Sequence, residues 1–230
     1  MLFHVRSKKS GFELYKKKIM KIIDLTHFIA ESMPVYPGSR RPSISDANTI
    51  VKDGYAEKMI SMSSHTGTHI DAPAHMIDKG TSLDMMDFSR FAGMAYVIDV
   101  SSLKKKEIGE ADVSLKAMSE ADFILFYTGW SQFWGKDQYF KDYPVLSAEL
   151  ATKISQLNLK GIGLDVISID PVGAKDFVNH MIIFRSDMLI IENLTNLDLL
   201  REKEFMFVCN PLKLKDADGS PVRAFGYYDD

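Results

Sequence analysis

Short runs of mostly apolar side chains, rich in β-branched and aromatic residues, recur along this chain. A run of this kind predicts a buried strand. They stand at residues 21–25, 96–100, 123–127, 188–191 and 205–209. Residues 58–63 instead alternate polar and apolar side chains, as in a strand with one buried face. We expect the run at 205–209 to be the last strand of the core.

Helical spacing appears between these runs. Leu150 and Ile154 would share one face of a helix that begins at Ser147, whose hydroxyl can cap it. A strand-like run follows at residues 161–166, and a charged helix is expected at about 112–120. A helix followed directly by a strand is an αβ unit. The predicted fold class is therefore α/β with a mixed sheet rather than an all-β sandwich.

The length of 230 residues favours one large domain with a substantial core. A content of 46% hydrophobic and 26% charged residues is typical of a globular protein. Strand-like patterning starts near Met20, so we expect this domain to cover residues 20–230. Residues 1–19 are basic and lack the apolar centre of a secretory signal. We predict that they form an N-terminal extension without a catalytic role.

Charge and cysteine content exclude several classes of partner. The net charge of −3 offers no electrostatic basis for binding nucleic acid or an acidic membrane surface. No apolar stretch reaches the roughly 18 residues that a membrane-spanning helix needs. The single cysteine, Cys209, excludes an internal disulfide and fits a reducing compartment. We therefore expect a cytoplasmic protein with a small-molecule partner and a buried, structural thiol.

The densest chemistry lies in residues 64–75. Three of the six histidines fall here, His65, His69 and His75, with Asp71 between them. Imidazole and carboxylate groups are ligands that first-row divalent metals prefer. A straight strand would place the Cα atoms of His65 and His69 roughly 13 Å apart. That span is too wide for two ligands whose donor atoms lie ~2.0–2.2 Å from one ion.

The segment must therefore bend, and Gly67 allows it because glycine adopts backbone angles that are closed to other residues. His69 and Asp71, two residues apart, can then project to one side, with His65 folded back beside them. The chain after the bend brings His75 near the same centre. The pattern predicts a divalent-metal site with one spare histidine.

The run His65-x-Gly-Thr-His69-x-Asp71-x-Pro-x-His75 is similar to the signature of the cyclase family of metal-dependent hydrolases. Bacterial kynurenine formamidases and isatin hydrolases belong to this family. The resemblance extends over roughly residues 22–225. It implies a swivelling β/β/α cyclase-like domain, assembly as a homodimer or homotetramer, and metal-dependent hydrolysis of a small amide.

His180 and Glu192 complete the metal centre that the resemblance implies. Taken alone, His180 is equally well explained as a loop histidine with a satisfied ring. Glu192 ends an apolar strand, where a carboxylate is costly unless it is paired or bound to a metal. In the family, a histidine and a glutamate at this spacing hold a second ion. The implied ligands are His65, His69, Asp71, His180 and Glu192. Zinc is the expected metal and manganese the alternative, and each subunit can hold up to two ions.

The resemblance also implies a mechanism and a substrate. A metal-bound water would supply hydroxide to the amide carbonyl, and His75 would act as the general acid–base. Tyr36, on the rigid loop between Pro34 and Pro37, stands where kynurenine formamidases have a tryptophan that lines the pocket. An aromatic wall favours a planar aryl group. The expected reaction is hydrolysis of N-formylkynurenine to kynurenine and formate.

Two alternatives stay open. One is a hydrolase that opens a cyclic amide, imide or lactone, as isatin hydrolases do. The other is a non-catalytic metal-binding protein that kept the fold; such a protein would be expected to lose its proton-transfer residue first, and His75 is present. The sequence contains no Gly-x-Ser-x-Gly elbow and no phosphate-binding glycine loop that would indicate another chemistry.

Overall fold

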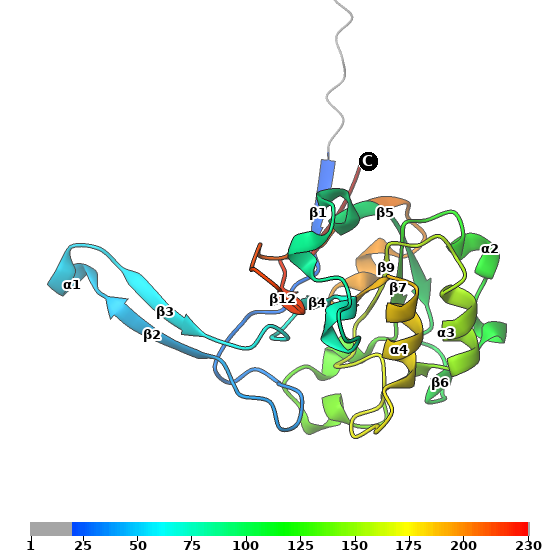
Figure 1. Ribbon diagram of the computed structural model, residues 1–230, viewed down its shortest axis with the longest axis horizontal. Coiled ribbons are helices and arrows are strands. Elements are labelled where there is room, and N and C mark those ends of the chain that lie inside the picture. Colours follow the sequence, from blue (N-terminus) through cyan, green and yellow to red (C-terminus); the bar gives the residue numbers. More distant parts are fainter. Residues whose placement is uncertain (1–19, 230) are drawn as a thin grey trace, which may run out of the picture.

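A nine-stranded mixed sheet forms the centre of the computed structural model, which describes residues 20–229 (Figure 1). In spatial order the strands are β1 (Met20–Asp24), β13 (Phe225–Asp229), β11 (Phe205–Val208), β5 (Ala92–Asp99), β7 (Phe123–Tyr127), β9 (Gly161–Leu164), β10 (Leu189–Glu192), β4 (His69–Asp71) and β12 (Gly219–Pro221). Strands β5, β7, β9 and β10 run parallel, and the other pairings are antiparallel. The prediction of a mixed α/β fold is confirmed. The predicted extension at residues 1–19 lies outside the described residues.

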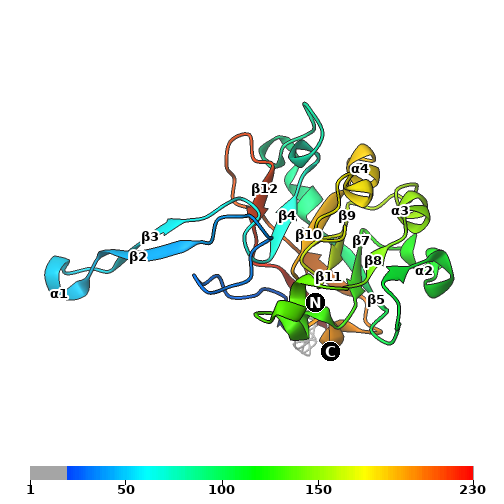
Figure 2. The same ribbon diagram turned by 90° about the horizontal axis from the view of Figure 1, so that it is seen from below.

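Each face of the sheet carries its own apolar core. On β7, Ile124 and Phe126 face one core while Phe123 and Leu125 face the other, and all four side chains are fully buried. A strand that is covered on both faces reads as a continuous apolar run, which explains why this strand was predictable. The first core is covered by α2 (Leu115–Met118), α3 (Ala148–Ile154) and α4 (Val178–Arg185), as Figure 2 shows.

The helices agree only in part with the sequence. Ser147 caps α3 as predicted, since its hydroxyl accepts a hydrogen bond from the Leu150 amide at 3.1 Å. Helix α2 is shorter than the expected 112–120. Helix α4 was not predicted, because its sequence is rich in β-branched and aromatic residues with low helix propensity. Packing of Ile183 and Phe184 into the first core stabilises it instead.

The strand at 205–209 is not the last, as the sequence had suggested. Strand β13 follows it and pairs with both β11 and β1, while β12 pairs with β4 at the opposite edge of the sheet. Strand β12 has only three residues and includes Pro221, which is tolerated at a sheet edge. So short a segment carries no alternation that sequence could reveal. A separate two-stranded parallel pair joins β6 (Glu107–Ile108) and β8 (Val145–Leu146).

A hairpin projects away from the body of the molecule, and we call it the arm (Figures 1 and 2). It consists of β2 (Ser43–Asn48) and β3 (Glu57–Ser61), with α1 (Ile50–Asp53) at its tip. The predicted strand at 58–63 exists, but every residue of β3 is exposed, so the expected half-burial was wrong for these residues. Nothing else in the described chain covers its apolar side chains.

Short 3₁₀ turns and long loops connect these elements. The turns span Pro73–His75, Leu83–Met85, Phe88–Phe91, Glu110–Asp112, Trp130–Phe133, Asp137–Phe140 and Leu197–Leu200. Cys209 is fully buried, as predicted, and burial raises the pKa of its thiol. Among residues 20–229, no helix has the combined length and apolar character that crossing a membrane would require.

Candidate metal centre

The backbone bends at Gly67, as the ligand spacing required. Gly67 has a φ of +68°, in the left-handed region that favours glycine. Its carbonyl accepts a hydrogen bond from the side-chain amide of Asn193 at 2.9 Å, which ties the bend to the end of β10. The Thr68 hydroxyl donates in turn to the Asn193 carbonyl at 2.6 Å. These bonds hold the bend rigidly beside the sheet.

Strand β4 sets the two residues after the bend on one side. His69 and Asp71 face the same way, while Ile70 between them points into the second core and is fully buried. His65 folds back so that its Nδ1 lies 2.6 Å from Asp71 Oδ1. The Nε2 of His69 lies 3.3 Å from the same oxygen. Three predicted site residues therefore lie together, with both histidine rings next to the Asp71 carboxylate.

Two later segments bring the other half of the site. Glu192 is the last residue of β10 and pairs with His69 across the sheet, while His180 comes from α4. One Glu192 oxygen lies 3.5 Å from His69 Nε2, and the other lies 3.5 Å from His180 Nε2. The site thus lies beyond the carboxyl end of a parallel strand, where open α/β sheets place their ligands.

Three groups in the described chain have donor atoms spaced to hold a divalent ion, with the atoms in each group within 4.8 Å of one another. One group is His65, His75 and Asp218. The other two share Asp71, and they are His65, His69 and Asp71, and then Asp71, His180 and Glu192. Because Asp71 is shared, the two positions are adjacent, which is the arrangement that a two-ion centre needs.

Each candidate ligand histidine also has an acceptor behind it. An acceptor on one ring nitrogen fixes the tautomer and presents the other nitrogen to a metal. The acceptors are Gly67 O for His69 (2.8 Å), Asp170 Oδ2 for His180 (2.7 Å) and Asp218 Oδ2 for His65 (2.9 Å). The nitrogens left facing the site are Nε2 of His69, Nε2 of His180 and Nδ1 of His65.

Neither of these two carboxylates, Asp170 and Asp218, was identified from the sequence as a partner of a site histidine. Asp170 does structure its loop, since it accepts from the backbone amides of Asn179 and His180 at the start of α4. The same carboxylate also orients the His180 ring. Asp218 lies 153 residues from His65 in sequence, so no local spacing could connect them. Its place shortly before Pro221, in a segment that resembles the family, was the only available signal.

The charges in the site fit a cation. Asp71 is 1% exposed and Glu192 5%, and no ion pair among the described residues brings a lysine or arginine to either carboxylate. Burial opposes charging of His65, but Asp71 and Asp218 outweigh it and raise its pKa to about 9. Burial likewise opposes charging of His180, but Asp170 and Glu192 raise its pKa to about 10. Without a metal, protons on these rings supply the positive charge that the carboxylates need.

The site opens into a cavity of about 600 Å³. Tyr36 lines it, and its hydroxyl accepts a hydrogen bond from the Gly173 amide at 3.3 Å. Phe177, which sequence reasoning did not single out, also lines it and meets His180 edge to face. His75 lines the cavity as well. The cavity can therefore hold a flat apolar group next to the candidate metal ligands.

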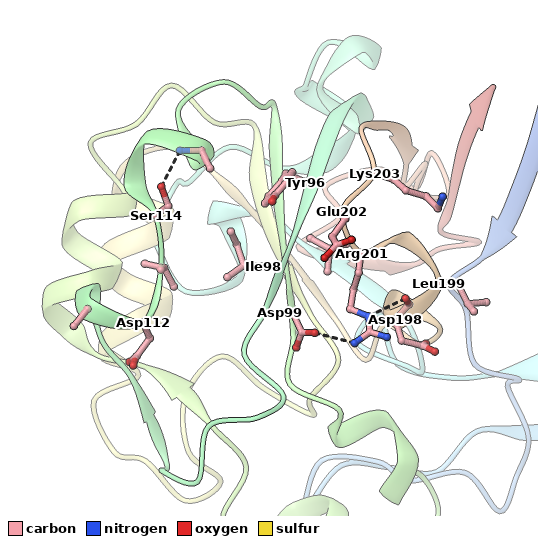
Figure 3. Close-up of a pocket in the computed structure, with 14 residues that line it drawn as sticks. Tyr96, Ile98, Asp99, Asp112, Ser114, Asp198, Leu199, Arg201, Glu202 and Lys203 are labelled. Carbon is pink, nitrogen blue, oxygen red and sulfur yellow. Dashed lines mark hydrogen bonds and ion pairs between the residues drawn. The ribbon is translucent and has the colours of Figure 1, made fainter. Parts of the chain in front are cut away.

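A larger groove of about 770 Å³ lies elsewhere, between α2 and the turn at Leu197–Leu200 (Figure 3). Its residues include Asp99 and Arg201, which pair with each other at 3.0 Å, so these two charges are already neutralised. No histidine of residues 20–229 lines it. The groove offers no comparable donor set, and the smaller cavity is the candidate active site.

Comparisons with known proteins agree with this geometry. The family model described as a putative cyclase matches residues 23–171. A kynurenine formamidase of Bacillus thuringiensis (strain Al Hakam) is 32% identical over 209 residues, which cover 90% of this chain and 97% of that protein. A solved structure described as a predicted metal-dependent hydrolase from Bacillus stearothermophilus is 28% identical, with a TM-score of 0.77 and coverage of 91% and 98%.

Isatin hydrolase A from Ralstonia solanacearum is 23% identical, with a TM-score of 0.81 and coverage of 91% of this chain and 92% of that one. At this identity the likeness concerns the fold alone. The cyclase-like fold that the sequence predicted is confirmed.

Metal binding by the metal-free protein should release protons. At pH 7 the rings of His65 and His180, with pKa values of about 9 and about 10, carry protons that a cation must displace. Zinc affinity should therefore rise with pH up to about 10, the higher of the two pKa values, and fall as the pH drops. Titration calorimetry in buffers of different ionisation enthalpy measures the protons released. Zinc uptake without proton release would contradict the assignment of these rings as ligands.

Proposed function

Because this chain belongs to the putative cyclase family, we propose that it is a metal-dependent hydrolase acting on a C–N amide bond other than a peptide bond. One observation carries this proposal. Two donor groups that share the buried Asp71 lie beside a cavity large enough for a small amide. The candidate acid–base residue lines the same cavity.

We assign His65, His69 and Asp71 to one ion, and Asp71, His180 and Glu192 to a second. Mixed imidazole and carboxylate donors suit zinc, with manganese as the alternative. A divalent cation held here supplies polarisation of the amide carbonyl and acidification of a water. The protein's part is to hold the donors in place, exclude bulk water and move a proton.

His75 belongs to neither of these two donor groups and is the proposed acid–base residue. Its ring centroid lies 3.9 Å from that of His65, close to the reacting centre. Burial lowers the pKa of His75, so its ring is neutral at pH 7 and able to accept a proton. The protonated ring can then deliver that proton to the leaving nitrogen.

Substitution should separate the two histidine roles. His69→Ala should lose metal, as measured by elemental analysis, because it removes a donor. His75→Asn should keep metal and melting temperature but lose about 10²–10⁴ in kcat, the usual range for a general acid–base. Chelation should abolish hydrolysis in the wild type, and zinc or manganese should restore it. Equal metal loss in both variants would make His75 a ligand.

The cavity walls favour an aryl amide. Tyr36 and Phe177 contribute flat aromatic faces, and Met76 and Ile167 add apolar surface. Aryl groups stack on such faces with about 0.5–1.5 kcal/mol beyond area burial. An arylformamide such as N-formylkynurenine is our first candidate, in keeping with the name of the Bacillus thuringiensis relative.

One observation favours a second candidate. Among residues 20–229, no lysine or arginine lines this cavity, whereas Asp176 does, so a substrate carboxylate finds neither of these side chains to pair with. A neutral, planar cyclic amide such as isatin suits these walls as well as an arylformamide does. The isatin hydrolases share this fold.

Steady-state assays should distinguish these substrates. We expect turnover of N-formylkynurenine and of the neutral compound formanilide, with isatin as the competing candidate. Tyr36→Ala should lower kcat/KM about 3- to 10-fold through lost stacking, while the matched variant Tyr36→Phe keeps the ring and most of the activity. If only an aliphatic amide or a lactone is hydrolysed, the aryl proposal fails. If the metal-loaded protein hydrolyses none of them, the non-catalytic alternative is favoured.

We further propose that the chain acts as a homo-oligomer in the cytoplasm. The arm exposes apolar side chains that a monomer would leave in water. They are Ile50, Val51, Tyr55, Met59 and Ile60, each at least 53% exposed. A second copy packed on the arm would bury them. The single free and buried Cys209 fits the reducing cytoplasm.

A charged substitution on the arm tests the assembly. The double variant Met59→Glu/Ile60→Glu should sediment as a monomer with an unchanged circular dichroism spectrum, because burying an unpaired charge in an apolar interface is costly. Leu212→Glu, which is 53% exposed but outside the arm, is the matched control and should leave the assembly intact. A wild type that sediments as a monomer would refute the proposal.

A further inference from the structure

A single carboxylate oxygen faces two site histidines. Asp218 Oδ2 lies 2.9 Å from Nε2 of His65 and 3.6 Å from Nδ1 of His75. The two rings lie against each other, tilted by 36° with centroids 3.9 Å apart. Asp218 therefore touches both the histidine assigned to the metal and the histidine assigned to proton transfer.

The backbone holds Asp218 in this place. Its carbonyl accepts from the Ala72 amide at 2.9 Å, and the next residue, Gly219, pairs with Asp71 across the sheet. A Cβ on Gly219 would lie 2.6 Å from the nearest atom of the His65 ring, so the backbone of β12 runs directly against that ring. The edge strand thus brings the carboxylate to the ring and leaves no space between them.

A neutral imidazole has one N–H and one acceptor nitrogen, so a fixed acceptor selects the tautomer. With Nε2–H of His65 donated to Asp218, Nδ1 is the nitrogen presented to Asp71 and its cation. With Nδ1–H of His75 directed to the same oxygen, Nε2 is left to exchange a proton with the substrate. The second contact is long for a hydrogen bond, and such contacts commonly shorten when substrate binds.

We propose that Asp218 is a positioning residue that serves both histidines at once, fixing the tautomer of His65 and aiming Nε2 of His75 at the leaving nitrogen. This inference rests on the proposed hydrolase function. One oxygen has two lone pairs, so it can accept from both rings. The metal ligand and the proton donor are thereby held in a fixed relation by one side chain.

His65, His75 and Asp218 also satisfy the spacing of a metal-binding group. That arrangement conflicts with the first ion. His65 would have to offer Nε2 to one metal and Nδ1 to another, but a neutral ring has only one unprotonated nitrogen. With His65 committed to Asp71 and its ion, only two donors remain. A positioning role is therefore the better explanation for Asp218.

The first test uses ring-substituted formanilides whose leaving anilines differ in pKa. Asp218→Asn should lower kcat about 10- to 100-fold with little change in KM, the range seen for partners behind ligands. The rate should also depend more steeply on leaving-group pKa, as in His75→Asn, because proton delivery is impaired. The double variant should be little slower than His75→Asn alone, since both substitutions damage one step.

The second test does not need activity. Competition with a chelator should show zinc affinity about 10- to 100-fold weaker in Asp218→Asn, because His65 loses its orienting acceptor. Asp218→Glu, which retains the charge, should recover part of the affinity. Asp216→Asn is the matched control, since Asp216 is exposed, lies two residues away and pairs only weakly with Lys215 at 4.0 Å.

Each outcome decides the matter. The inference would be overturned if Asp218→Asn kept the wild-type dependence on leaving-group pKa and the wild-type zinc affinity. It would also be overturned if the rate loss of the double variant equalled the product of the losses of Asp218→Asn and His75→Asn. If the wild type hydrolyses no formanilide, the proposed function fails instead, and the zinc competition still decides whether Asp218 supports His65. If Asp218→Asn does not fold, Asp218→Ala and Asp218→Glu provide the same comparisons.

Discussion

Two carboxylates, those of Asp71 on β4 and Glu192 at the end of β10, are buried, and within residues 20–229 all of their ion-pair partners are histidines. Removing such groups from water costs several kcal/mol each unless positive charge offsets the loss. In this molecule protonated His65 and His180 can supply that charge, and a bound divalent cation would do so more completely. The need for a cation therefore links the stability of this region to its chemistry.

The sheet topology places those carboxylates at one point. Strand β4 lies between β10 and β12, so it brings its own Asp71 beside Glu192 on one side and Asp218 on the other. Strand β4 has only three residues, so His69 and Asp71 are the two residues on its face toward the metal site. A shift of one residue in register would turn both side chains into the second core. Fully buried Ile70 opposes that shift, because it packs in the second core.

Each candidate ligand histidine has a hydrogen-bond acceptor on the ring nitrogen that does not face the metal site. A backbone carbonyl serves His69, while carboxylates serve His180 and His65. These acceptors come from the bend, from the loop after β9 and from the residue before β12. Preorganisation of this kind means that a metal meets oriented rings, and the entropy cost of ordering them is met by folding.

Local patterns were sufficient for much of this protein. Strands β7 and β10, which are covered on both faces, were predicted as apolar runs, and Ser147 was predicted to begin α3. The spacing of the ligand residues from His65 to Asp71 required the bend that is found at Gly67. These features depend on neighbours in the sequence, where periodicity, capping and ligand spacing are visible.

Tertiary structure decided the rest. Helix α4 forms against the first core despite its weak propensity, and it turns His180 from an ambiguous loop histidine into a neighbour of Glu192. Strand β12 is too short to be recognised, yet it delivers Asp218 to a histidine 153 residues away. Local sequence determined which side chains could bind a metal and where the chain had to bend. Which distant carboxylates stand behind those side chains was decided by strand pairing, because long-range contacts leave no periodic trace in the sequence.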